Sequence, residues 1–194
     1  MSDKISAKEY SLSKIFSADF EYHIPKYQRP YSWTETETKT LFYDLLEFTE
    51  NEAKRNSEVE GTYFLGSIVS YENDEGEQEI IDGQQRITSL FLLLRAIYTK
   101  LLSYEEKTVE QENFIRQIQP ALWKQAKLTG EVDYTSVLIT SKVIDNEGNK
   151  ILQDILETGI ADHKANDNYS KNYILFQRLF DKLSELSPTL MLEF

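Results

Sequence analysis

A short polar stretch between two apolar segments carries the residue types best suited to chemistry. Residues 82–86 read Asp-Gly-Gln-Gln-Arg and join a strand-like segment to a long helical one. The start of a helix presents free backbone N–H groups and the positive end of the helix dipole, which together attract an anion. Arg86 would add a guanidinium group that matches phosphate oxygens. Asp82, beside such a phosphate, could hold Mg²⁺ or orient a water molecule.

The same stretch also has a purely structural interpretation. Asp82 can cap the helix while Gln85, three residues later, reaches back in a variant of the capping box. Gly83 permits the tight strand-to-helix turn. Such a cap contributes about 0.5–2 kcal/mol. It accounts for Asp82 and Gln85 but not for Gln84 and Arg86, so both interpretations stay open on these residues alone.

A second polar group lies among aromatic rings in residues 24–33. Gln28 and Arg29 stand there between three aromatic residues, Tyr27, Tyr31 and Trp33. The structural interpretation is an aromatic core cluster with the arginine stacked on it. In the functional interpretation the rings hold a base while Gln28 and Arg29 reach its polar groups or a phosphate.

Composition excludes several classes of function. The chain has 194 residues, a net charge of −12 and no cysteine, which excludes disulfides, cysteine-ligated zinc and thiol catalysis. An acidic chain is a poor general DNA binder, because such binding depends on many Lys and Arg residues. No apolar run approaches the roughly 20 residues of a membrane span, and the N-terminus lacks a signal-peptide pattern. We therefore expect a cytoplasmic protein without a membrane partner.

Hydrophobic periodicity predicts an α/β (α+β) fold in which a small mixed sheet precedes a mainly helical portion. A buried strand at 62–71 and its neighbour at 77–82 flank a polar turn, which predicts an antiparallel hairpin. Further expected strands are 20–25 and 136–140. Thr34 and Glu37 form a capping box that should open a helix. The other expected helices cover 83–102, 108–126, 147–157 (capped by Asp145 or Asn146) and the segment from Tyr169 to Leu183.

Three segments together resemble one known family. They read IPKYQRPYSW (24–33), YFLGSIV (63–69) and DGQQRITSL (82–90), and a later SKNYILF (170–176) fits the same pattern. In this order they resemble the DUF262 proteins, also called the GmrSD type, whose N-terminal domain is ParB-like. The resemblance implies a ParB-like motif-bearing portion at 1–104 and a mainly helical portion of the same domain at 105–194. We expect the chain to be cut short at its C-terminus.

The resemblance implies the N-terminal, nucleotide-binding and nucleotide-hydrolysing domain of a bacterial restriction protein that acts on foreign or modified DNA in defence against phage. Its cofactor would be a nucleoside triphosphate with Mg²⁺. Its partners would be a C-terminal nuclease domain or subunit, DNA reached through the full-length protein and, as one option, a second copy in a homodimer. Two alternatives are a domain that nicks DNA directly and a non-enzymatic module that senses a nucleotide.

Roles follow for the residues that match the motifs. Catalytic roles are expected for Asp82, Gln84, Gln85 and Arg86, and nucleotide binding for Tyr27, Gln28, Arg29, Trp33, Gly83 and Arg86. Asp82 would also bind Mg²⁺. Arg29 would close the site from the other segment.

Overall fold

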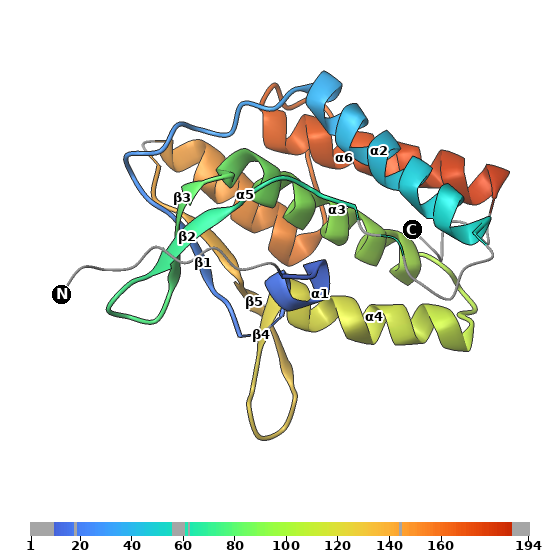
Figure 1. Ribbon diagram of the computed structural model, residues 1–194, viewed down its shortest axis with the longest axis horizontal. Coiled ribbons are helices and arrows are strands. Elements are labelled where there is room, and N and C mark those ends of the chain that lie inside the picture. Colours follow the sequence, from blue (N-terminus) through green and yellow to red (C-terminus); the bar gives the residue numbers. More distant parts are fainter. Residues whose placement is uncertain (1–9, 18, 56–60, 62, 144, 188–194) are drawn as a thin grey trace.

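A mixed sheet and the helices packed on it form the described part of the chain. The computed structural model describes residues 10–17, 19–55, 61, 63–143 and 145–187. Its elements, in order, are α1 (Leu12–Ile15), β1 (Tyr22–Ile24), α2 (Glu35–Ala53), β2 (Val69–Glu72), β3 (Gln78–Asp82), α3 (Gln84–Leu102), α4 (Val109–Leu122), β4 (Trp123–Gln125), β5 (Val132–Val137), β6 (Ile139–Ser141), α5 (Asn146–Thr158) and α6 (Asn168–Leu186) (Figure 1). The predicted mixed α/β fold is confirmed.

The central sheet has the strand order β2-β3-β1-β6. β1 is parallel to both neighbours, whereas β2 and β3 form the predicted antiparallel hairpin. The strand predicted at 62–71 is wrong in extent and burial, since among residues 63–71, the part of that range that the structure describes, the strand begins only at Val69. All four residues of this strand, Val69–Glu72, are exposed. Gly66, with φ of +89°, interrupts the extended backbone. Residues 63–68 instead pass beside the start of α3.

Helix α3 is the centre of the fold, as its sequence pattern predicts. Its side chains are buried on more than one face, and Leu92 and Leu93 are as buried as the main apolar stripe. α4, α5 and α6 all contact it, and α2 packs on α6 (Figure 1). The capping box of α2 forms as expected, with the Thr34 N–H donating to Glu37 Oε2 over 2.7 Å.

The region after residue 104 differs in detail from the prediction. α4 ends at Leu122 rather than near residue 126, because Trp123 turns into the core between Tyr98 and Tyr134 and begins β4. β4 pairs with β5, and β6 joins the edge of the central sheet. α5 has Asp145 as its cap and Gly159 at its end, as predicted. The proposed division at residue 104 stays a prediction.

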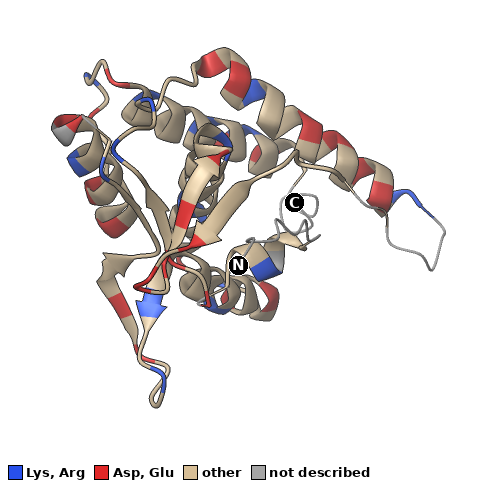
Figure 2. Ribbon diagram, turned by 60° about the vertical axis from the view of Figure 1, so that its left-hand side comes forward, with Lys and Arg blue, Asp and Glu red and all other residues tan. Residues whose placement is uncertain are grey.

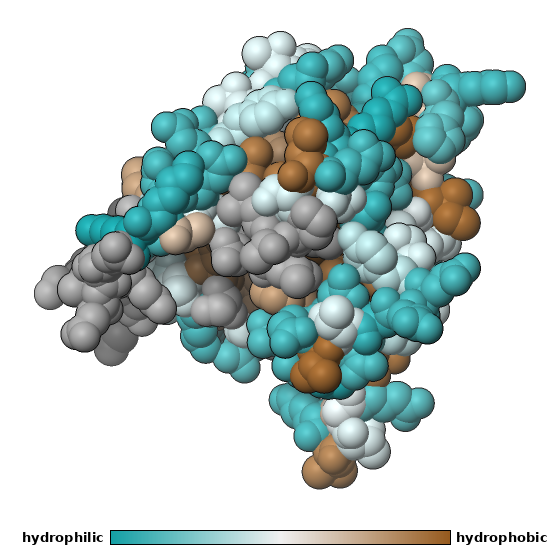
Figure 3. All heavy atoms as spheres, turned by 90° about the vertical axis from the view of Figure 1, so that its right-hand side faces the viewer, coloured by the Kyte–Doolittle hydropathy of each residue, from teal (hydrophilic) through white to brown (hydrophobic). Residues whose placement is uncertain are grey.

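The face of the molecule in Figure 3 is mostly hydrophilic where its residues are described. The face in Figure 3 shows scattered hydrophobic residues among polar ones, and acidic residues are spread over the helices and the central strands (Figure 2). Among the helices of the described ranges, none is long and apolar enough to cross a membrane.

A buried cation connects α3 to the end of α5. Arg95 is 5% exposed and forms no ion pair with any carboxylate of the described chain. Its Nε donates to the Leu156 carbonyl over 2.9 Å, and the rings of Tyr98 and Trp123 face its guanidinium at 5.4 and 5.3 Å. Burial lowers the pKa of Arg95. The negative end of the α5 dipole and the two ring faces compensate the charge.

We predict that Arg95→Ala lowers the free energy of unfolding by about 2–4 kcal/mol, because it leaves a cavity and an unpaired carbonyl. Urea unfolding measures the loss. Arg116→Ala is the control, since Arg116 is exposed and its ion pair with Glu112 spans 3.8 Å; it should change stability by less than about 0.5 kcal/mol. Equal losses in the two variants would contradict the role given to Arg95.

Candidate functional site

The three sequence segments meet at the start of α3. Residues 24–33 lie on one side of the first helical turn, and residues 63–69 lie on another. Gln28 joins the first segment to the end of β3, since its Nε2 donates to the Ile81 carbonyl over 2.6 Å. This bond holds the loop that carries Arg29 next to Asp82.

Gln85 holds the second half of the same loop. Its Oε1 accepts from the backbone N–H of Ser32 at 2.7 Å and of Trp33 at 3.3 Å, while its Nε2 donates to the Pro30 carbonyl at 3.1 Å. Gln85 is 6% exposed. Because both ends of the amide bind backbone groups, Gln85 positions the loop and has little capacity left for a ligand.

Arg86 faces the other neighbouring segment. Its guanidinium donates to the Ser67 carbonyl over 3.1 Å and lies directly against Gly66. A Cβ at Gly66 would come within 2.7 Å of the guanidinium carbon, so a side chain there would displace the arginine. Arg86 is half-buried and forms no ion pair with the described carboxylates.

The helix cap differs from the structural interpretation of the sequence. The N-cap of α3 is Gly83, in the left-handed conformation, and no side chain caps the helix. Asp82 instead ends β3, is exposed and pairs in register with Val69. The predicted Asp82–Gln85 capping box is therefore wrong, because Asp82 is still in the strand and Gln85 binds the loop at 30–33. The expected role of Gly83 in the tight turn is confirmed.

The remaining site residues lie at different depths. Gln84 is buried, and its amide makes no hydrogen bond to any residue that the structure describes. Arg29 is exposed and forms no ion pair or hydrogen bond with them. Tyr27 is 65% exposed, and Trp33 packs partly against the core. Whether the guanidinium groups of Arg29 and Arg86 reach one ligand stays a prediction.

A buried polar network behind the loop was missed by the sequence reasoning. The Tyr31 hydroxyl lies 2.6 Å from Ser89 Oγ and accepts from Asn172 Nδ2 at 3.0 Å; the same Nδ2 lies 2.8 Å from the Trp33 carbonyl. The Tyr31 ring stacks on Tyr169, and burial raises the pKa of Tyr31. Asn172 belongs to the SKNYILF segment, so that segment was the available signal.

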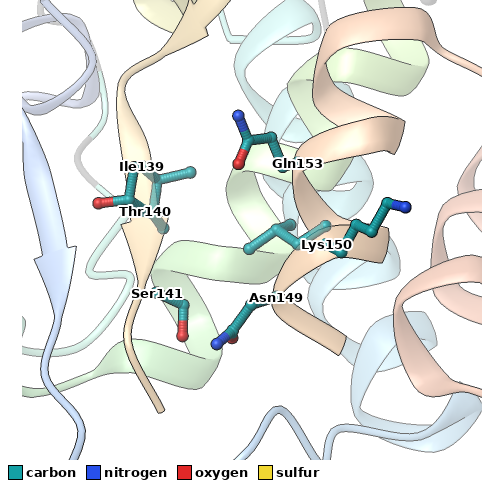
Figure 4. Close-up of a pocket in the computed structure, with 7 residues that line it drawn as sticks. Ile139, Thr140, Ser141, Asn149, Lys150 and Gln153 are labelled. Atoms are coloured by element: carbon teal, nitrogen blue, oxygen red, sulfur yellow. The ribbon is translucent and has the colours of Figure 1, made fainter. Parts of the chain in front are cut away.

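Two hollows lie along α5, and residues 82–86 line neither of them. The smaller, about 220 Å³, lies between β6 and α5, where Ser141 faces Asn149 and Ile139 lies opposite Gln153 (Figure 4). The larger, about 750 Å³, includes five carboxylates, those of Asp145, Glu147, Asp154, Asp162 and Asp167. Such a lining repels a polyanion, so neither its position nor its charge suits a triphosphate.

The described residues contain no group of three His, Asp or Glu side chains placed to hold a metal ion. Asp82 therefore belongs to no three-residue metal site among the described residues. A single carboxylate suits Mg²⁺ that arrives with a phosphate ligand, since Mg²⁺ is often held by one or two carboxylates together with phosphate oxygens and water.

We predict that Gly83→Ala destabilises the fold more than Gly76→Ala does. The two glycines have φ of +89° and +82°, so an alanine at either position has the same backbone strain, about 1–2 kcal/mol. A Cβ at Gly83 would also meet the Ser67 carbonyl oxygen at 3.0 Å, whereas nothing lies within 4 Å at Gly76. Urea unfolding measures the stability of both variants, and the difference between their losses reports the contact with the Ser67 carbonyl rather than the backbone strain. Equal losses would show that segment 63–69 does not depend on Gly83.

Removing the Gln85 amide should release the loop at 30–33. Gln85→Leu leaves two backbone N–H groups and one carbonyl unpaired, which costs about 2–4 kcal/mol of stability. Hydrogen exchange of the Ser32 and Trp33 amides should accelerate beyond the change caused by Gln117→Leu, an exposed helical control. Unchanged exchange at both amides would refute the positioning role.

Comparison with known proteins places the chain in a family. The model of the family described as GmrSD restriction endonuclease, N-terminal domain, matches residues 12–192. None of the curated proteins matches the chain. The matched range contains all three segments that meet at α3 and covers nearly the whole sequence. The chain therefore belongs to the family of GmrSD restriction endonuclease N-terminal domains.

Proposed function

We propose that this domain binds and hydrolyses a nucleoside triphosphate at the start of α3, within a restriction protein. The observation that carries the proposal is the helix start itself. A helix of 19 residues begins there without a side-chain cap, and an arginine lies in its first turn. The first-turn N–H groups of such a helix attract phosphate oxygens. The structural cap that would have explained this stretch without a ligand is absent.

The residues around the helix start divide into two groups. Gln28 and Gln85 are engaged with backbone groups and so position the loop at 24–33. Arg29 and Asp82 are exposed and free of such bonds, and Arg86 uses one nitrogen on Ser67. We assign phosphate binding to Arg86, Arg29 and the α3 N–H groups. Gly83 allows the close approach of the backbone.

Hydrolysis would use the groups at the end of β3. Mg²⁺ supplied with the nucleotide would neutralise phosphate charge when bound, and Asp82 is the carboxylate that would hold it. Asp82 and the unpaired amide of Gln84 would orient the attacking water. Tyr27 and Trp33 would hold the base by stacking. The nucleotide state would then control a nuclease domain or subunit, which is the partner that contacts DNA.

The direct test is a panel of ribonucleoside triphosphates with Mg²⁺, with calorimetry for binding and a phosphate-release assay for turnover. Arg86→Ala should weaken binding by about 10–100-fold, the value of a charge-assisted hydrogen bond. Arg86→Lys keeps the charge but loses the paired N–H groups of the guanidinium. Its affinity for the nucleotide should therefore lie between those of the wild type and Arg86→Ala. Arg55→Ala is the matched control, because Arg55 is exposed and pairs with Glu52.

Asp82→Asn separates hydrolysis from sensing. Retained binding with loss of phosphate release would support the assigned role of Asp82. If the wild type binds the nucleotide but releases no phosphate, the domain senses the nucleotide and does not hydrolyse it. An unchanged dissociation constant in folded Arg86→Ala would refute the phosphate site at α3.

A further inference from the structure

One face of the central sheet carries a row of polar side chains that crosses all four strands, and His23 within this row is buried. Strand register places Tyr71 of β2 beside Glu79 of β3, Glu79 beside His23 of β1, and His23 beside Thr140 of β6. His23 Nδ1 lies 2.8 Å from Thr140 Oγ1, and His23 Nε2 has no partner among the described residues. The opposite face, with Tyr22 and Ile80, packs into the core.

One tyrosine hydroxyl binds the carboxylate at the centre of this row, and a second tyrosine lies beside that carboxylate on the neighbouring strand. The Tyr27 hydroxyl donates to Glu79 Oε1 over 3.1 Å. A hydrogen bond to Glu79 also raises the pKa of Tyr71 to about 12. The rings remain open to solvent, with Tyr27 65% and Tyr71 44% exposed, and Ile81 beside them is 46% exposed. The result is a fixed carboxylate between two accessible aromatic rings.

The charge of this carboxylate is not neutralised within the described chain. Glu79 forms no ion pair with any described Lys or Arg. The adjoining turn between β2 and β3 adds further acids, Glu72, Asp74, Glu75 and Glu77. The hydrogen bond from Asn73 chiefly lowers the pKa of Glu77, and the nearby charges of Lys142 and Lys124 add to this, but Lys124 pairs with Glu21. This end of the sheet is therefore acidic, and red segments mark the central strands in Figure 2.

We propose that the surface formed by Tyr27, Tyr71, Glu79 and Ile81 docks a basic segment of a partner protein. An arginine or lysine side chain would lie against the tyrosine rings and pair with Glu79, because an aromatic face and a carboxylate both favour a cation. Ile81 would pack on the aliphatic stem of that side chain. Charge complementarity excludes DNA as the occupant of this face. This surface shares Tyr27 with the proposed nucleotide site, whereas Tyr71, Glu79 and Ile81 have no role there, so Glu79→Gln tests docking separately from nucleotide binding.

The test uses a capped Gly-Arg-Gly-Arg-Gly peptide added to the isotope-labelled domain, followed by amide chemical shifts. Shifts should concentrate at residues 23, 71, 79 and 81. The same peptide with citrulline in place of arginine keeps the shape without the charge and should cause none of them. Glu79→Gln should weaken arginine-peptide binding by about tenfold.

Glu106→Gln is the control with the same loss of charge, since Glu106 is exposed in the α3–α4 loop. It should leave binding unchanged. The double variant Tyr27→Phe with Tyr71→Phe keeps both rings but removes the hydroxyl groups beside the Glu79 carboxylate. It should weaken peptide binding less than Glu79→Gln does. A well-dispersed amide spectrum would show that the double variant is folded. Shifts spread evenly over the acidic helices, or equal effects of Glu79→Gln and Glu106→Gln, would overturn the proposal.

Discussion

The amide of Gln85 connects the helix at the centre of the fold to the loop that carries Arg29. It satisfies backbone groups of Pro30, Ser32 and Trp33, none of which lies in a strand or helix that could pair them. One residue further on, Arg86 binds segment 63–69 on another side of the same turn. Because successive helical residues point about 100° apart, neighbouring side chains can serve two separate segments. The first turn of α3 thus fixes both neighbours at once.

This arrangement explains why the helix begins with glycine. Gly83 lies against the backbone of Ser67 and Ile68, where a Cβ would be too close. A residue with a capping side chain at that position would push segment 63–69 away. The fold therefore gives up a stabilising cap, worth about 1 kcal/mol, and leaves the first-turn N–H groups beside a guanidinium without a capping side chain from the described residues. That exchange is the physical basis of the proposed phosphate site.

Sequence patterns were most reliable where one local interaction decides the outcome. The capping box at Thr34, the stop at Gly159 and the helical period of α3 all appear as predicted. The sequence patterns failed where tertiary packing determines the local structure. Trp123 leaves its helix for a buried position against Tyr98, and the strand predicted from residue 62 begins only at Val69, after Gly66 has turned the backbone against Arg86. The motifs indicated which segments come together at α3, but not the positioning roles of Gln28 and Gln85, since their partners are backbone groups about 50 residues away in sequence.

The central claim is that phosphate binds at the first turn of α3. The most direct measurement is the amide spectrum of the labelled domain on addition of a non-hydrolysable nucleoside triphosphate with Mg²⁺. We predict saturable shifts at the backbone amides of residues 83–87 and at the side chains of Arg29 and Arg86. A folded domain whose spectrum stays unchanged there, or shifts only along the hollows beside α5, would contradict the claim.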